Sequence, residues 1–296
     1  MRTRPFFVSH GGEHLAAAVT LPDGEPRGVV LLLFWAPPLG LIGINFWGRA
    51  AARLAKRSLA TIRFEYAGSG DSTGVVRRWP LFDTGPQADQ ALAMARVAMS
   101  ELGFDTFAVA GACLDGQVAL QLARDPSCAG AVCIDTPVGE PQALTRLRRR
   151  AAGWRAVSLV RSNPTLRRVL FFDRIRRMLG DRPSPQLREA LGQALHHARV
   201  LMLYNDANMD AKGRGIVDLV DTRSGSPVAG EVRYEHRRGV SLGPRKVDRP
   251  QLTAGEESTL DTLTDWLSGC FDERAADRTG PSSVDAALVS GPERLA

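Results

Sequence analysis

The order of apolar runs and helical patterns along the chain predicts an α/β fold with a mostly parallel, doubly wound sheet. Short apolar segments alternate with amphipathic helical patterns, an order that places helices on both faces of a parallel sheet. The run 28–34 is Gly-Val-Val-Leu-Leu-Leu-Phe, and such continuous apolar runs are typical of strands buried on both faces. In segment 105–120 an apolar run, a tight corner and a helical pattern follow one another.

These patterns assign the elements in order. Residues 5–9 and 14–20 flank Gly11-Gly12 and predict a β-hairpin. Further strands are expected over 28–34, 60–66, 107–110, 131–135, 200–204 and 231–236. Helices are expected over 46–57, over 86–101, from about residue 114 onward, and over 256–267. No internal repeat is visible, so these elements predict a single sheet with its helices.

The corner Gly111-Ala112-Cys113 has the layout of a nucleophile elbow, in which a sharp turn between a strand and a helix exposes one side chain. Here that side chain is a thiol. The dipole and the unpaired N–H groups at a helix N-terminus favour the thiolate form. We therefore expect Cys113 to be the nucleophile of an enzyme that handles acyl groups.

Two further segments carry a resemblance to a known family. Residues 60–74, Ala-Thr-Ile-Arg-Phe-Glu-Tyr-Ala-Gly-Ser-Gly-Asp-Ser-Thr-Gly, resemble the R-F-D-Y-x-G-x-G-D-S segment that follows the fourth strand of α/β-hydrolases. The stretch 36–45 is similar to the cysteine-bearing α/β-hydrolases found beside exosortase systems, and to the cysteine acyl shuttles of natural-product pathways. The resemblance covers roughly residues 5–270 and implies an α/β-hydrolase fold with a helical cap inserted after the sixth strand.

The resemblance divides the chain into a core and an insertion. We expect residues 1–137 and 199–271 to form the α/β-hydrolase core and residues 138–198 to form a helical, arginine-rich cap. The tail 272–296 is rich in small and charged residues and is expected to be disordered.

The family pattern also assigns candidate partners to Cys113. The base should be a histidine after the last strand, and His236 is the only one of the five histidines in that part of the chain. The acid position matches Asn208, with Asp206 as an equal candidate and Asp135 and Asp210 behind them. An asparagine can orient a histidine in cysteine enzymes.

Two other features of the resemblance concern the elbow. The first oxyanion donor should be the N–H of Leu114, and the second should come from the loop around Ala36, with Trp35 or Leu39 as alternatives, because Pro37 and Pro38 have no N–H. The family has glycine two positions after the nucleophile, whereas this chain has Asp115. A carboxylate there opposes ionisation of the thiol unless it points away or is paired.

Positive charge is concentrated in the predicted cap. Residues 140–190 contain thirteen arginines against four acidic residues, a balance of +9 compared with +6 for the whole chain. This suits an acidic acyl carrier protein or coenzyme A, with Arg148, Arg149 and Trp154 as candidate contacts. A solvated helix face or a subunit interface would explain the arginines equally simply. Nucleic acid is disfavoured because aromatic residues are not interleaved among them.

Composition sets the remaining limits. The four cysteines lack metal-site spacing and are expected to be free thiols, with Cys128 and Cys133 as core residues. Glycines 68, 70 and 74 lack the spacing of a phosphate loop, so we expect Asp71-Ser72 to tie that loop down by hydrogen bonds. We expect neither metal nor cofactor, and no segment is long enough to span a membrane, so a cytoplasmic location is expected. The oligomeric state is not indicated.

The sequence therefore predicts a cysteine-dependent thioesterase or acyltransferase acting on acyl thioesters or esters in a bacterial biosynthetic pathway. Two alternatives remain. One is a catalytically degenerate member that serves as a scaffold or catalyses another reaction, such as a cyclisation. The other is a hydrolase of small esters or lactones.

Overall fold

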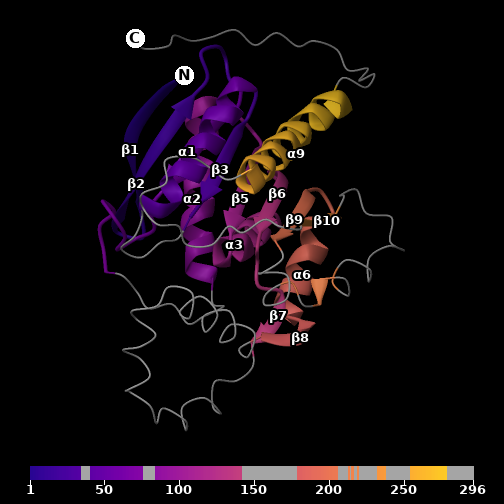
Figure 1. The fold of residues 1–296 in the computed structure, drawn as a ribbon. Coiled ribbons are helices and arrows are strands. Elements are labelled where there is room, and N and C mark those ends of the chain that lie inside the picture. The colour runs from indigo at the N-terminus through magenta and orange to yellow at the C-terminus, as the bar shows by residue number, and fades with distance from the viewer. Residues whose placement is uncertain are drawn as a thin grey trace, which may run out of the picture.

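The computed structural model describes residues 1–34, 41–75, 84–141, 179–205, 213, 215, 216, 219, 232–237 and 254–278. Within these residues the chain forms an eight-stranded sheet with helices on both faces (Figure 1). The sheet order is β1-β2-β4-β3-β5-β6-β9-β10, and a separate two-stranded sheet pairs β7 with β8. The α/β class and the doubly wound sheet predicted from the sequence are confirmed.

The strands of the main sheet are β1 (Arg2–His10), β2 (Glu13–Leu21), β3 (Val29–Leu33), β4 (Ala60–Phe64), β5 (Phe107–Ala112), β6 (Cys128–Ile134), β9 (Arg199–Asn205) and β10 (Val232–Arg237). The small sheet consists of β7 (Gly139–Pro141) and β8 (Leu179–Pro183). The helices are α1 (Leu41–Lys56), α2 (Gly85–Leu102), α3 (Leu114–Leu122), α6 (Pro185–Ala194) and α9 (Ala254–Arg278).

The sheet is antiparallel at one edge and parallel elsewhere. Strands β1 and β2 form the expected hairpin, whose turn residues Gly11 and Gly12 have φ values of 58° and 83°. These are values that glycine adopts without steric cost. Strand β2 pairs antiparallel with β4, and every pairing from β4 to β10 is parallel. The carboxyl ends of β5, β6, β9 and β10 therefore lie at one edge of the sheet.

The two faces of the sheet are buried by different helices. In β3, Val29, Leu31 and Leu33 pack into one apolar cluster and Val30 and Leu32 into the other, as the period of two in a strand requires. Helices α2, α3 and α6 cover the first face, and α1 and α9 cover the second. This arrangement explains why the parallel strands are continuous apolar runs.

The predicted cap is described only at its two ends. Strands β7 and β8 lie there, and residues 142–178 are outside the described residues. Helix α6 falls inside the range 138–198, yet Leu187, Ala190, Leu191 and Ala194 are buried in the same apolar cluster as α2 and α3. The core thus already includes α6. At the other end, α9 continues to Arg278, beyond the boundary that the sequence suggested at Phe271.

Candidate active site

Cys113 occupies the turn between β5 and α3, and its backbone has the unusual geometry of an elbow. Its φ and ψ are 59° and −120°, a conformation that costs a non-glycine residue about 1–3 kcal/mol. The Cys113 N–H donates to the Ile134 carbonyl at 2.8 Å, and the Gly116 N–H donates to the Cys113 carbonyl at 3.1 Å. The residue as a whole is partly exposed. The surrounding hydrogen bonds therefore hold a strained turn that places Cys113 at the start of α3.

Two glycines allow the helix to approach the strands so closely. A Cβ at Gly111 would overlap the backbone carbonyl of Asp115. A Cβ at Gly116 would overlap the Oγ1 of Thr136, which follows β6. Glycine is required at both positions for steric reasons, although neither has a positive φ. Gly116 thus provides the close approach one position later than the family pattern expects.

The Asp115 carboxylate has a hydrogen-bond partner. This is one of the conditions under which a carboxylate at this position need not oppose ionisation of the Cys113 thiol. Asp115 is only 4% exposed, and its Oδ1 accepts a hydrogen bond of 2.9 Å from the hydroxyl of Tyr66. Burial, followed by the nearby Asp115 charge, raises the pKa of Tyr66 well above its ordinary value of 10.0. Tyr66 therefore stays a neutral donor. Tyr66 belongs to the R-F-x-Y part of the segment 60–74, so the departure at Asp115 and this segment meet directly beneath the elbow.

The loop after Tyr66 is tied down largely as predicted. The Ser72 hydroxyl donates to the Glu65 carbonyl at 2.6 Å and accepts from the Ala16 N–H at 2.8 Å. Asp71 contributes its backbone N–H, which donates to the Glu65 carboxylate at 2.6 Å. The serine has the expected role, whereas at Asp71 the backbone makes the contact.

The register of the strands places four residues at one level of the sheet edge, namely Cys113, Asp135, Tyr204 and His236. Ala112 pairs with Ile134, Ile134 with Leu203, and Tyr204 with His236. Cys113 and Asp135 come directly after the first pair. Adjacent strands lie about 4.8 Å apart, so the backbone of Asp135 is one strand spacing from Cys113, and that of His236 is three spacings, or roughly 14 Å.

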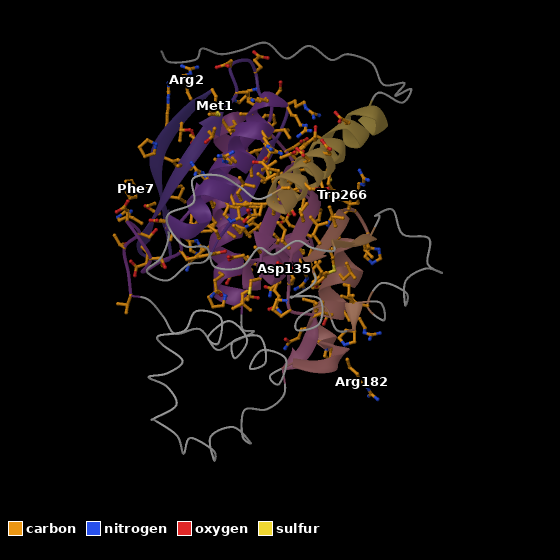
Figure 2. The ribbon with its side chains drawn as sticks, in the orientation of Figure 1. Met1, Arg2, Phe7, Asp135, Arg182 and Trp266 are labelled. Carbon is orange, nitrogen blue, oxygen red and sulfur yellow. The ribbon has the colours of Figure 1, made fainter. Side chains whose placement is uncertain are left out.

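Of the four candidate acids, Asp135 is the one that lies among the described residues. It directly follows β6 (Figure 2). It has a φ of 50° and is 4% exposed. Its N–H donates to the Leu203 carbonyl at 2.7 Å, which continues the ladder one residue beyond β6. Two adjacent strands of the sheet, β5 and β6, are therefore each followed directly by a non-glycine residue with a positive φ.

The histidines divide clearly by position. His10 and His14 lie in the β1–β2 hairpin, and His196 and His197 precede β9 at the opposite edge of the sheet from Cys113. The His197 Nε2 is 3.0 Å from the Ala123 carbonyl at the far end of α3. His236 lies within β10, rather than after it, and the structure describes its backbone and not its side chain. The elimination that selected His236 is thus consistent with the fold, but its role stays a prediction.

The remaining predicted site residues divide into one that is described and several that are not. Leu114 is the first residue of α3, where an N–H has no partner within the helix, as an oxyanion donor requires. The others lie outside the described residues: Ala36, Trp35, Leu39, Asp206, Asn208, Asp210, Arg148, Arg149 and Trp154.

The other cysteines confirm the contrast that the sequence predicted. All four are free thiols, and Cys128, Cys133 and Cys270 are buried. Burial raises the pKa of Cys133 to about 12, and its thiol donates to the Gly116 carbonyl at 3.2 Å. Among the described residues, no group of three or more His, Cys, Asp or Glu side chains is arranged to hold a metal ion. Cys113 is the one partly exposed cysteine of the four.

The Tyr66–Asp115 pair was not anticipated from the sequence. The two residues are 49 positions apart, and only the sheet order brings the loop after β4 beneath the start of α3. The available signal was Asp115 itself, an acidic residue at a position where the family pattern has glycine. A buried carboxylate there required a buried donor, but the sequence could not say which.

Solved structures share this architecture. A dienelactone hydrolase from Anabaena variabilis matches with a TM-score of 0.57 at 14% identity, covering 90% of this chain and 97% of that one. A proline iminopeptidase from Mycobacterium smegmatis matches with a TM-score of 0.56 at 16% identity, covering 92% of this chain and 100% of that one. An α/β serine hydrolase homologue from Coxiella burnetii matches with a TM-score of 0.54 at 14% identity, over 90% and 96%.

The chain has the α/β-hydrolase fold. No protein-family model and no curated protein sequence matches it. The elbow at Cys113 lies after β5 of the α/β-hydrolase sheet, so the resemblance expected from the segments around 60–74 and 105–120 is confirmed at the level of the fold. None of the described helices combines the length and apolar character needed to cross a bilayer.

Proposed function

We propose that the protein is an acyl-transfer enzyme, a thioesterase or acyltransferase, whose nucleophile is Cys113. The observation that supports this most directly is the backbone of Cys113, strained at φ 59° and ψ −120° between β5 and α3 in a partly exposed residue. Strain of this kind persists only where the surrounding structure imposes it, and it is concentrated at active sites. A buried structural cysteine such as Cys133 needs no such turn.

The proposed chemistry has two balanced steps. The Cys113 thiolate attacks the carbonyl carbon of a thioester or ester, the bond from carbon to the leaving sulfur or oxygen breaks, and the leaving group takes up the proton that the thiol gave. The Leu114 N–H, with a donor from the loop around Ala36, would stabilise the oxyanion. Water or another nucleophile then attacks the acyl carbon, the bond from carbon to the Cys113 sulfur breaks, and the sulfur takes back the proton that the nucleophile loses, giving hydrolysis or transfer respectively.

Proton transfer is assigned to His236, oriented by Asn208 or Asp206. The His236 backbone is about 14 Å from that of Cys113, which is farther than the two side chains and one hydrogen bond span, so proton transfer between them requires a bridging water. Asp135 is much nearer to Cys113 and is the alternative acid. We propose that the reaction occurs in the cytoplasm and that an acidic carrier protein or coenzyme A delivers the acyl group, with Arg148, Arg149 and Trp154 as contacts.

A small-molecule ester or lactone hydrolase is the second candidate function. It is supported by the similarity in fold to the dienelactone hydrolase, although an identity of 14% extends only to the fold. A catalytically degenerate scaffold is the third, and it draws on Asp115 standing where the family has glycine. The pairing of Asp115 with Tyr66 weakens this third reading, because the carboxylate is directed to a partner of its own.

Intact mass spectrometry after incubation with acyl-thioester donors tests the proposal. We expect an acyl adduct in the wild-type protein and in Cys128→Ala, a matched control at a buried thiol, and none in Cys113→Ala. Slow loss of the adduct in water indicates transfer, and rapid turnover indicates hydrolysis. An adduct that survives Cys113→Ala, or no adduct and no turnover with any donor, would overturn the assignment.

A further inference from the structure

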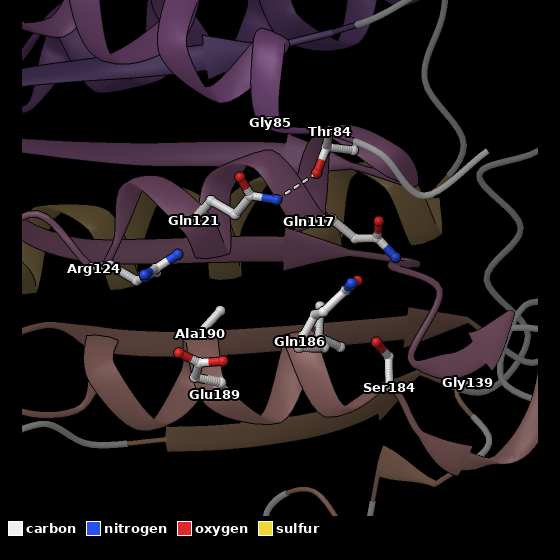
Figure 3. Close-up of a pocket in the computed structure, with 11 residues that line it drawn as sticks. Thr84, Gly85, Gln117, Gln121, Arg124, Gly139, Ser184, Gln186, Glu189 and Ala190 are labelled. Atoms are coloured by element: carbon white, nitrogen blue, oxygen red, sulfur yellow. Dashed lines mark hydrogen bonds between the residues drawn. The ribbon is translucent and has the colours of Figure 1, made fainter. Parts of the chain in front are cut away.

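A polar cavity lies on the α3 side of the sheet, outside the elbow itself. It has a volume of about 340 Å³ and is bounded by α3, by the N-terminal ends of α2 and α6, and by β7 (Figure 3). The side chains that matter for its chemistry are Thr84, Gln117, Gln121, Arg124, Ser184 and Gln186. Leu187 and Ala190 are the only apolar side chains in its wall as described, so it does not suit an acyl chain.

The lining is dominated by groups that hydrogen-bond without charge. Gln121 donates through Nε2 to the Thr84 hydroxyl at 2.6 Å, and Gln117 donates through Nε2 to the Pro137 carbonyl at 2.8 Å. These bonds fix both side chains through their nitrogen atoms, which leaves the amide oxygens to accept from a ligand. Arg124 and Glu189 both line the cavity, and their opposite charges offset each other. The site therefore suits a neutral, extended ligand that contains amide and hydroxyl groups.

The cavity follows the helix that starts at the nucleophile. Cys113, Gln117, Gln121 and Arg124 are spaced four, four and three residues apart, which puts them on one face of α3 and its C-terminal extension. At 1.5 Å per residue, Arg124 lies about 16 Å along the axis from Cys113. Gln117 is one turn from the thiol, and Figure 3 shows Gln117, Gln121 and Arg124 in that order along the cavity.

The end of the cavity nearest the elbow is also connected to it through the sheet. Gln117 holds the Pro137 carbonyl, and Pro137 comes two residues after Asp135, the residue beside Cys113 in the register. Gly139 of β7 and Ser184 line this end together with Gln117, which is one helical turn from Cys113. A ligand that extends from this end to Cys113 would lie along α3.

We infer that this cavity binds the pantetheine arm of an acyl thioester whose acyl carbon is presented to Cys113. The arm is neutral, contains two amides and a hydroxyl, and has about the backbone length of five residues, which spans roughly 17 Å when extended. Length, polarity and hydrogen-bonding groups thus match the path from Cys113 to Arg124. The inference rests on the proposed function, and it applies whether the arm belongs to coenzyme A or to a carrier protein.

The test compares donors that differ only in the arm. We would measure the second-order rate of Cys113 acylation by acetyl-N-acetylcysteamine, which has a short arm, and by acetyl-pantetheine, which has the full arm. The wild-type protein should favour acetyl-pantetheine by at least about tenfold. The double variant Gln121→Leu, Gln186→Leu should lose that preference. Arg188→Leu, a change on α6 outside the cavity, should keep the preference.

Equal rates with the two donors in the wild-type protein, or a preference that the double variant retains, overturn the inference while leaving the proposed function in place. A further gain with acetyl-CoA or with an acetylated carrier protein over acetyl-pantetheine identifies the source of the arm. Failure of both donors to acylate Cys113 counts against the proposed function instead.

A binding measurement keeps the two outcomes separate. Titration calorimetry of S-methyl pantetheine, which cannot react, should show binding to Cys113→Ala that the added Gln121→Leu, Gln186→Leu changes weaken at least fivefold. Absence of binding to Cys113→Ala overturns the inference regardless of activity. Unfolding curves of each variant would exclude loss of the fold as the cause.

Discussion

The two helical layers of this protein are built differently. On the α1–α9 side, apolar residues of both helices pack on the sheet, and outside them arginines of α1 pair with acidic residues of α9. The partners recur every four residues: Arg49 and Arg53 on α1 with Arg57 directly after it, and Glu257, Asp261 and Asp265 on α9. This layer therefore has an apolar interior and a regular row of ion pairs on its surface.

The α2–α3–α6 side departs from such patterning around Cys113. It has the strained turn at Cys113, the close approach at Gly111 and Gly116, the buried Tyr66–Asp115 pair and the polar cavity. Local rules are broken mainly at functional sites, so these features support the proposal that Cys113 is the nucleophile. The α1–α9 side also has close approaches, at Gly28 against Phe271 and at Gly130 against Cys270, but there the nearest atoms belong to side chains.

The largest expected effect is at Gly111. Gly111→Ala places a Cβ against the carbonyl of Asp115, and a backbone atom cannot rotate away. We expect the free energy of unfolding to fall by about 3 kcal/mol or more and Cys113 labelling to be lost from the folded state. Urea denaturation measures this.

The matched control is on the other layer. In α1, a Cβ at Gly48 would be 3.6 Å from the nearest atom, the Arg63 Nη1, an ordinary contact. Gly48→Ala should raise the free energy of unfolding by about 0.5–1 kcal/mol. Similar destabilisation by both substitutions would contradict the distinction between the layers.

The second prediction concerns pH. Burial raises the pKa of Cys133 from an ordinary value of 9.0 to about 12, so the folded state holds this proton more tightly than the unfolded state. The resulting stability is complete below pH 9 and is lost progressively between pH 9 and 12, up to about 4 kcal/mol. Cys133→Ala should reduce the decline in unfolding free energy over that range. Val132→Ala, a comparable truncation on β6, should leave the slope unchanged, and an equal effect of both would argue against the thiol.

The third prediction tests the pair beneath the elbow. Tyr66→Phe removes the hydroxyl that donates to the buried Asp115 carboxylate, and we expect a loss of about 1–3 kcal/mol in the free energy of unfolding. Tyr204→Phe is the control, because the Tyr204 hydroxyl donates to a neutral acceptor, the Thr136 carbonyl. Its loss should be nearer 1 kcal/mol. A smaller loss at Tyr66 than at Tyr204 would mean that Asp115 does not depend on this donor.

The smallest effect is expected on the α1–α9 side. Arg53 pairs with both Glu257 and Asp261 at the surface, where ion pairs contribute little and salt screens them. Arg53→Met should lower the free energy of unfolding by no more than about 1 kcal/mol at low salt. Repeating the denaturation in 1 M NaCl should remove the difference. A large loss that persists at high salt would show that this layer is held by more than its apolar packing.

The sequence predicted most of the fold because strands and helices carry local patterns. The run 28–34 contains β3 (Val29–Leu33), and the corner at residues 111–113 is the elbow at the position expected. The range 138–198, which includes α6, was assigned to the cap from the resemblance. The burial of α6 in the same apolar cluster as α2 and α3 is a tertiary contact that the sequence does not show.

By itself the sequence determined the alternation of strands and helices, and it determined which cysteine follows a sharp turn. Both depend on interactions between residues close in the chain, namely side-chain periodicity and the sterics of a few backbone angles. The tertiary structure decided that Tyr66 faces Asp115, that His236 is three strands from Cys113, and that a polar cavity follows α3. These depend on the lateral order of strands, which is set by packing across the whole sheet and which no short segment encodes.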